Sequence, residues 1–158
     1  ARKVKALYPE TQFELLGSMD PSYPKSVPAE RLSQDEADGI LKYIGFTHDM
    51  NSVYKRKGIV ITLPSYSEGM NRALMEACAS GKPIITSDIP GCQEAVDDGV
   101  NGYLVPVKDS DALAEAMLRY IRLSDELKRK FSNMSRIKAE NLFDINNVIE
   151  KYKRIVGE

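Results

Sequence analysis

The chain has 158 residues, 42% of them hydrophobic, which suits one globular domain that buries about two thirds of its unfolded surface. Its 22 basic and 23 acidic side chains nearly balance, so no long-range field favours nucleic acid or an anionic bilayer. No apolar run is long enough for a transmembrane helix and no secretory signal pattern occurs, so we expect a cytoplasmic protein. Cys78 and Cys92 lack the spacing of a metal or redox site, which agrees with a reducing compartment.

Short apolar runs alternate with amphipathic stretches, which predicts an α/β fold of βα units around a parallel sheet. The expected strands are residues 12–16, 41–45, 59–63, 83–86 and 103–105. The expected helices are a first one that ends before Pro9, a short one capped by Ser33, and residues 48–55, 110–122, 124–135 and 145–156. Residues 20–24 are expected to form a turn, and so are Gly99, Asn101 and Gly102, where a positive φ is tolerated.

Two glutamates, Glu68 and Glu76, stand with seven residues between them where the third expected strand gives way to a helix. The strand is a run of mainly β-branched apolar residues, typical of a parallel strand covered on both faces. The first turn of the following helix leaves backbone N–H groups unpaired at its positive end, which suits a phosphate. Hydroxyl acceptors on either side of an anion site predict a sugar nucleotide as the ligand.

The helix is expected to begin at Ser67 or Glu68. Gly69, Met70 and Asn71 would then present the free N–H groups to the ligand, and Gly69 would leave room for its approach. A helix from Glu68 to Glu76 would rise about 12 Å, comparable with the reach from a ribose across a diphosphate to a sugar.

Several motifs follow one another in the order and spacing of a known family. They are residues 13–17, 44–46, 63–69, 76–85 and 88–105. Over residues 11–156 the chain resembles the donor-binding domain of retaining GT-B glycosyltransferases, particularly the bacterial family 4 group, also called glycosyl transferases group 1. This resemblance implies a Rossmann-like parallel sheet that forms the C-terminal half of a GT-B fold. It also implies transfer of a sugar, with retention, from a nucleoside-diphosphate sugar such as a UDP or GDP sugar to a saccharide or lipid-linked glycan.

The resemblance assigns roles to individual residues. Glu68 would accept hydrogen bonds from the donor sugar as a positioning catalytic residue, and Glu76 would accept them from both ribose hydroxyls. Gly17, Phe46 and Thr47 would lie near the base, at the carboxyl ends of neighbouring strands. The resemblance also implies no metal and no other cofactor, because helix N–H groups and basic side chains usually take the place of a metal in this family.

One departure from the family concerns the start of the chain. The family's donor domain opens with a further strand and a glycine-rich loop whose Arg and Lys bind the diphosphate, and nothing in residues 1–10 resembles them. We therefore expect residues 1–158 to be a single truncated domain, inactive alone, whose partner is an N-terminal acceptor domain of the same polypeptide. Any peripheral membrane association would come through that domain. The final helix would expose part of its apolar face, namely Ile145, Val148, Ile149, Tyr152 and Ile155.

Other functions compete with a glycosyltransferase. A nucleotide-sugar epimerase shares the architecture, whereas a phosphorylase would need a cofactor lysine and Lys82 lacks a supporting pattern. A non-catalytic nucleotide-binding or regulatory module is a third interpretation, although Asp88 alone does not make a phosphate-accepting site.

Several candidate residues also have a purely structural explanation. Glu68 would stabilise its own helix, and Arg72 would simply be solvated, whereas Glu76 lies on a helix expected to be largely buried and therefore needs a partner. The single histidine, His48, is expected in a turn, and Glu94 is expected to hold the loop at Gly91. Tyr66 and Tyr103 are expected to be packing residues.

Overall fold

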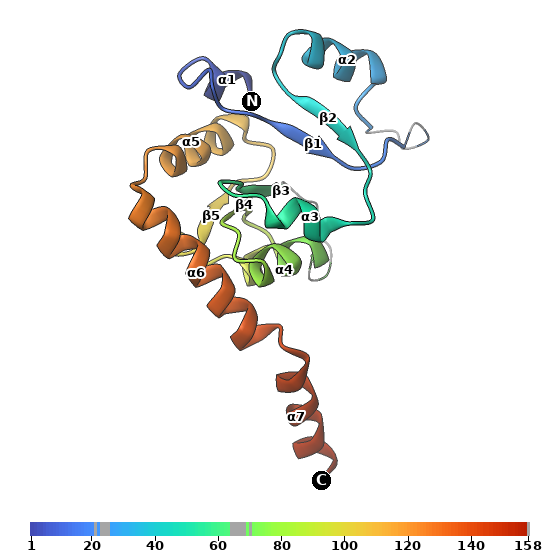
Figure 1. The fold of residues 1–158 in the computed structure, drawn as a ribbon. Helices are drawn as coiled ribbons and strands as arrows, with labels where there is room; N and C mark the ends of the chain where they lie inside the picture. Colours follow the sequence, from blue (N-terminus) through green and yellow to red (C-terminus); the bar gives the residue numbers. More distant parts are fainter. Residues whose placement is uncertain (21, 23–25, 64–68, 70, 158) are drawn as a thin grey trace. The chain divides into compact units, whose positions relative to one another are not determined.

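The computed structural model describes residues 1–20, 22, 26–63, 69 and 71–157. The chain divides into two compact units, Ala1–Asn51 and Ser52–Glu158, and each unit is described by itself. Figure 1 labels their helices and strands along the chain. The predicted α/β class is confirmed: every paired strand among the described residues is parallel, and the strands form one sheet in each unit.

The first unit pairs two short parallel strands. It contains α1 (Arg2–Lys5), β1 (Glu14–Leu16), α2 (Ala29–Ala37) and β2 (Lys42–Gly45). The register runs from Glu14 opposite Lys42 to Leu16 opposite Gly45, with an irregularity after Leu15. Gly45 has a φ of +69°, a conformation that side-chain-bearing residues rarely adopt, which explains a glycine at the end of this strand.

The start of α2 differs from the prediction. The helix begins at Ala29 behind Pro28, about one turn before the expected cap at Ser33. Leu32 is buried, so the earlier turn places an apolar side chain in the core of the unit. The expected turn at residues 20–24 lies mostly outside the described residues, although the Asp20 carboxylate accepts a hydrogen bond from the Ser22 N–H at 3.0 Å.

The second unit is built on a three-stranded parallel sheet. Its strands are β3 (Ile61–Leu63), β4 (Ile84–Ser87) and β5 (Gly102–Val105), in the order β3-β4-β5. All four residues of β4 are buried, as expected for a central strand with cover on both faces. A Cβ atom at Gly102 would lie 1.9 Å from the carbonyl oxygen of Ile84, so only glycine allows the two strands to pair here.

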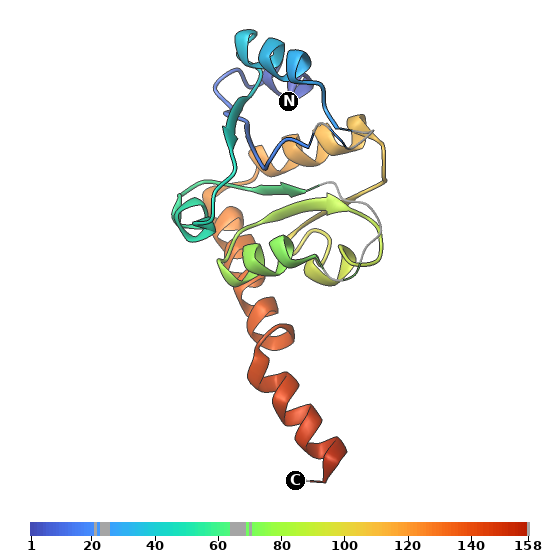
Figure 2. The same cartoon turned by 90° about the vertical axis from the view of Figure 1, so that its right-hand side faces the viewer.

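Helices cover both faces of this sheet. The helical segments from residue 50 onward are α3 (Met50–Lys55), α4 (Arg72–Ala79), the 3₁₀ turn η1 (Gln93–Ala95), α5 (Ser110–Ile121), α6 (Asp125–Leu142) and α7 (Ile145–Val156), and the last of these extends away from the sheet. Figure 2 shows α5 on one face of the sheet and α4 on the other. The core beside α5 joins Ile85, Tyr103, Val105, Ala116 and Phe131, which confirms Tyr103 as a packing residue.

Local signals placed most helix ends correctly. Asp109 caps α5 and Ser124 caps α6, each through a side-chain oxygen that accepts a backbone N–H of the first turn. The predicted end of α6 at Ser135 is wrong, because the helix continues to Leu142. Phe131, Ser135 and Ala139 form one buried stripe along it, so tertiary packing extends the helix past its polar middle.

Asn101 and Ser135 are polar residues at the centre of the second unit. Asn101 is 0% exposed; its Oδ1 accepts the N–H of Asp97 at 2.7 Å, and its Nδ2 donates to the carbonyl oxygen of Ala95 at 3.0 Å. The hydroxyl of Ser135 donates to the carbonyl oxygen of Lys82 at 2.8 Å. The expected turn is present at residues 99–101, with a φ of +72° at Gly99, whereas Gly102 already belongs to β5.

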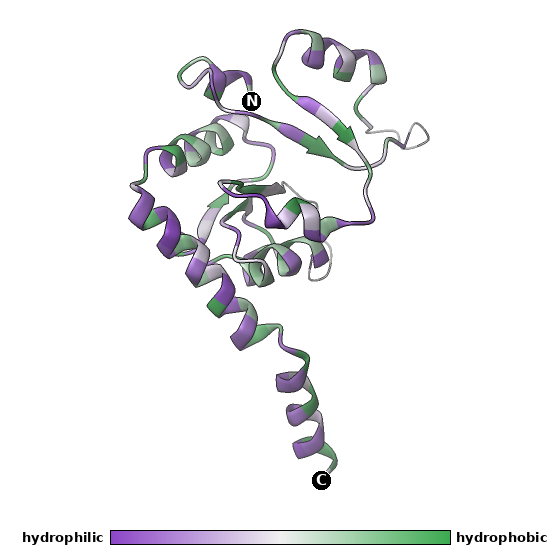
Figure 3. Cartoon of the chain, in the orientation of Figure 1, coloured by the Kyte–Doolittle hydropathy of each residue, from purple (hydrophilic) through white to green (hydrophobic). Residues whose placement is uncertain are grey.

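The exposed apolar face of α7 agrees with the prediction. Ile145, Ile149, Tyr152 and Ile155 are exposed, and Ile155 reaches 79%. Figure 3 shows apolar and polar residues sharing this helix. Across the part of the chain that the structure describes, no helix combines the length and the apolar character needed to cross a bilayer.

Candidate functional site

Glu76 lies in the middle of α4, with its side chain 35% exposed. Its Oε1 accepts a hydrogen bond from the Nε of Arg72, one turn earlier, at 2.8 Å. The Glu76 side chain is therefore more exposed than a position on a largely buried helix suggested. Its carboxylate does have a partner, as expected, and that partner is Arg72. Sequence reasoning treated Arg72 as a solvated side chain, although the four-residue spacing to Glu76 was a usable signal.

The start of α4 also differs from the prediction. Asn71, not Ser67 or Glu68, is the N-cap: its backbone is extended and its Oδ1 accepts the N–H of Leu74 at 3.3 Å. The helical rise that was expected to separate Glu68 from Glu76 therefore does not apply before residue 72. Ser67, Glu68 and Met70 lie outside the described residues, as does Tyr66, so the roles expected of them remain predictions.

Two residues that precede α4 lie in different surroundings. Gly69 is exposed, and a Cβ atom there would meet nothing within 4 Å, so the protein itself does not require a glycine at this position. The N–H of Asn71 donates to the carbonyl oxygen of Gly91 at 3.2 Å, so it is not the free group that was expected to face a ligand. The Oε2 of Glu94 accepts the N–H of Gly91 at 2.8 Å, which confirms its role in holding this loop.

Tyr54 supports α4 from α3. Its ring is 5% exposed, and its hydroxyl donates to the carbonyl oxygen of Ala73 at 3.1 Å. Burial, and secondarily the negative charge of Glu76, raises the pKa of Tyr54 to about 12. Tyr54 therefore stays a neutral hydrogen-bond donor near the Glu76 carboxylate, a role that sequence reasoning missed.

Three other reactive side chains have structural partners. The Cys78 thiol is buried and donates to the carbonyl oxygen of Ala95 at 3.2 Å, and burial raises its pKa to about 11. The Lys82 ammonium donates to the carbonyl oxygen of Arg56 at 2.8 Å, which gives it a structural role. One oxygen of Asp88 accepts a hydrogen bond from the side chain of Gln93 at 2.7 Å. None of these groups is placed as a nucleophile or a phosphate acceptor.

The residues expected near the base come together within the first unit. The N–H of Gly17 donates to the carbonyl oxygen of Gly45 at 2.9 Å, which joins the carboxyl ends of β1 and β2. Phe46 follows β2 directly, is 62% exposed, and meets His48 edge to face with 4.7 Å between ring centroids. Thr47 lies beside it, and its hydroxyl oxygen accepts the N–H of Asp49 at 3.0 Å. An exposed aromatic ring next to two strand ends suits contact with a flat heterocycle.

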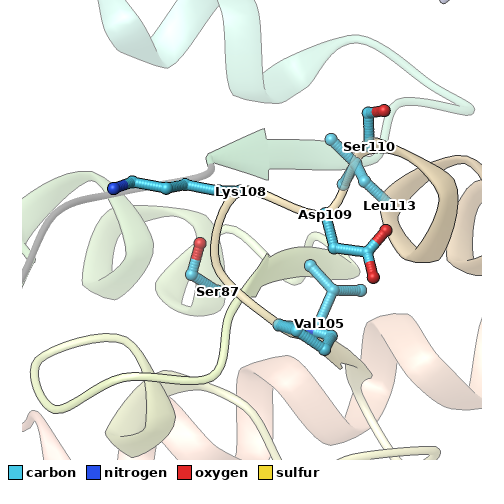
Figure 4. A pocket seen from close by; sticks show the side chains of 7 residues that line it. Ser87, Val105, Lys108, Asp109, Ser110 and Leu113 are labelled. Atoms are coloured by element: carbon cyan, nitrogen blue, oxygen red, sulfur yellow. The ribbon is translucent and has the colours of Figure 1, made fainter.

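A cavity of about 230 Å³ opens where β4 and β5 end and α5 begins. It is lined by Ser87, Val105, Pro106, Lys108, Asp109, Ser110 and Leu113. Figure 4 shows the Lys108 side chain extending away from the Asp109 carboxylate, which the structure uses as the cap of α5. None of the described residues predicted for the donor site lines this cavity. Among the described residues, no group of three His, Cys, Asp or Glu side chains is placed to hold a metal ion.

Comparisons with known proteins identify relatives of the whole chain. The family model described as glycosyl transferases group 1 matches residues 1–122. The UDP-N-acetylglucosamine–peptide N-acetylglucosaminyltransferase GtfA subunit of Streptococcus pneumoniae is 29% identical over 155 residues, which are 95% of this chain and 30% of the relative. The N,N'-diacetylbacillosaminyl-diphospho-undecaprenol alpha-1,3-N-acetylgalactosaminyltransferase of Campylobacter jejuni is 29% identical over 148 residues, 92% of this chain and 37% of the relative. The chain thus spans about a third of the length of these relatives.

Solved structures agree with this assignment. The pneumococcal O-GlcNAc transferase GtfA in complex with UDP and GlcNAc superimposes with a TM-score of 0.76 at 27% identity, over 98% of this chain and 31% of that one. Anabaena HepE in complex with UDP gives a TM-score of 0.82 at 22% identity, over 98% of this chain and 43% of that one, which is evidence for the fold alone. These matches confirm the resemblance to GT-B glycosyltransferases of the glycosyl transferases group 1 type, whereas retention and the family 4 assignment stay predictions. The chain belongs to the glycosyl transferases group 1 family, and its fold is that of the GT-B glycosyltransferases.

Proposed function

We propose that this chain binds the nucleoside-diphosphate sugar donor of a glycosyltransferase, and that a longer protein containing it transfers the sugar with retention to a saccharide or lipid-linked acceptor. The observation that carries this proposal is the Glu76 carboxylate. It lies on α4 in a matched family region, is partly exposed, and has oxygen lone pairs beyond the one that Arg72 occupies. Support comes from the pneumococcal relative, whose structure contains UDP.

The described residues suggest how the donor is held. Glu76 accepts hydrogen bonds from the two ribose hydroxyls, which are charge-assisted and therefore strong. The first N–H groups of α4, those of Arg72 and Ala73, have no intrahelical acceptor and lie at the positive end of the helix, where a phosphate is stabilised. Within the first unit, Gly17, Phe46 and Thr47 remain the residues expected from the sequence to contact the base.

Chemistry in this proposal depends on electrostatic stabilisation of the leaving diphosphate. Glu68 positions the donor sugar through its hydroxyls, and the donor's own phosphate assists the incoming acceptor. The helix N-terminus and basic side chains take the place of a divalent metal. The nucleotide assay below identifies which base the chain binds.

The proposal is tested by thermal unfolding with UDP, GDP and ADP. A diphosphate present at ten times its Kd stabilises the native state by about 1.4 kcal/mol. That stabilisation raises Tm by about 3–6 °C for a chain of this size. Glu76→Gln removes the charged acceptor and should abolish the increase in Tm with little effect on the ligand-free protein.

Glu140→Gln is the matched control, because Glu140 forms the same type of ion pair with Arg136, four residues earlier on α6, at 2.7 Å. This variant should respond to nucleotide as the wild type does. The proposed function is wrong if no nucleoside diphosphate changes Tm. If Glu76→Gln and the wild type respond equally, Glu76 is not the ribose ligand.

A further inference from the structure

The ion pair between Arg72 and Glu76 is unusual in how its two members are exposed. The Arg72 side chain is 91% exposed, whereas that of Glu76 is 35% exposed. The contact nevertheless has good hydrogen-bond geometry, with the Nε of Arg72 2.8 Å from Oε1 of Glu76. A highly exposed arginine at the start of α4 therefore pairs with a carboxylate one turn further along the helix that is partly enclosed.

Stability does not explain this contact well. Exposed ion pairs one helical turn apart contribute little to the free energy of folding. The order is also the weaker one, because an acidic residue that precedes its basic partner suits the helix dipole better than the reverse. The contact therefore matters more for the orientation of the Glu76 carboxylate than for the stability of α4.

A glutamate side chain has several rotatable bonds, so an unpaired Glu76 would sample many orientations. The hydrogen bond from Arg72 fixes one oxygen of the carboxylate and thereby the plane of the group. Tyr54 on α3 is buried and its hydroxyl donates to the carbonyl oxygen of Ala73 at 3.1 Å, so a fixed side chain holds the backbone of α4 between Arg72 and Glu76. Oε2 and one lone pair of Oε1 remain to accept two hydroxyls.

We propose that Arg72 is a positioning residue for the donor: it holds the Glu76 carboxylate in the orientation that accepts the two ribose hydroxyls. This inference rests on the proposed function, because it assumes that Glu76 is the ribose ligand. Binding to a carboxylate that is already ordered avoids the entropy of ordering one long side chain, an effect of about 2- to 12-fold in Kd.

The test compares a nucleoside diphosphate with its 2'-deoxy form by titration calorimetry, using whichever of UDP, GDP and ADP the wild type binds. Arg72→Ala should weaken binding of the ribonucleotide about 3- to 10-fold and weaken binding of the deoxynucleotide by less, because the deoxynucleotide keeps only the 3'-hydroxyl for Glu76. In a Glu76→Gln background the same substitution should have no further effect, since the two residues act through one contact. Arg72→Lys should restore only part of the affinity, because an ammonium lacks the planar guanidinium geometry.

Arg129→Ala is the matched control, because it removes the same charge from an exposed position of α6. This variant should bind both nucleotides like the wild type. Equal losses for the ribonucleotide and the deoxynucleotide would mean that Arg72 contacts the phosphates directly, and would overturn the positioning role. Full recovery with lysine would overturn it too, because charge alone would then suffice. If Glu76→Gln abolishes nucleotide binding but Arg72→Ala binds like the wild type, the inference about Arg72 is wrong and the proposed function stands. If the wild type binds none of the nucleotides, both fail.

Discussion

Replacing Asn101 with alanine should destabilise the second unit strongly, because this residue is completely buried and joins three segments of the chain. The substitution removes the acceptor of the Asp97 N–H and the donor to the Ala95 carbonyl oxygen. It also removes the hydrogen bond from Nδ2 to the hydroxyl of Ser135, at 3.3 Å.

The magnitude follows from what remains unpaired. A shielded N–H group without an acceptor costs about 1–3 kcal/mol. The Ala95 carbonyl keeps the Cys78 thiol as a weak donor, so its penalty is smaller. With the space that the truncated side chain leaves, we expect a loss of about 2–4 kcal/mol in the free energy of unfolding. Tm should fall by about 5–15 °C.

The assay is urea unfolding followed by circular dichroism, which gives the midpoint and the slope separately. Asn101→Asp is the informative second variant, because it preserves the shape and the acceptor but can donate to Ala95 only when protonated. Its folded-state pKa should therefore lie above the unfolded value of about 3.9. Stability should be retained below that pH and lost as pH rises through the folded pKa. A loss below about 1 kcal/mol for Asn101→Ala would refute the network argument. A pH-independent difference between Asn101→Asp and the wild type would refute it as well.

Three further predictions concern other parts of the second unit. Because the folded pKa of Tyr54 is about 12, above its ordinary value of 10.0, its contribution to stability is complete below pH 10 and is lost as pH rises toward 12. Alkaline unfolding of Tyr54→Phe should therefore show a smaller loss over that interval. The Cys78 thiol, with a pKa of about 11 and no exposure, should resist iodoacetamide in the native protein and react after unfolding, as mass spectrometry would show. Ile155→Lys on the exposed face of α7 should change the free energy of unfolding, obtained from urea titration, by less than about 0.5 kcal/mol, and a larger loss would mean that this face is covered in solution.

Features with a local cause could be predicted from the sequence. The caps of α5 and α6, Asp109 and Ser124, have such a local cause, because a cap needs only its own side chain and the next few N–H groups. The central strand β4 was identified from an apolar run that reflects burial on both faces. Family motifs, with Glu76 among them, led to the family that the comparisons then confirmed.

Features with a distant cause could not be predicted. Ser67, Glu68 and Asn71 are all acceptable N-caps by residue type, and the structure selects Asn71, whose N–H is held by Gly91 from a different loop. The glycine at Gly102 suggested a turn, whereas its cause is the carbonyl oxygen of Ile84 on a neighbouring strand. Such choices depend on which segments meet, and periodicity along the chain does not contain that information.

The backbone of Gly91 connects two parts of the second unit through two hydrogen bonds. Its N–H is held by Glu94 and its carbonyl oxygen by the N–H of Asn71, so the loop after β4 and the first turn of α4 cannot shift independently. A ligand that draws on the start of α4 must therefore also strain or relax this loop. Binding of a ligand at the start of α4 should therefore change the hydrogen-exchange rates of the Gly91 and Asn71 amide protons, which can be measured without any added label.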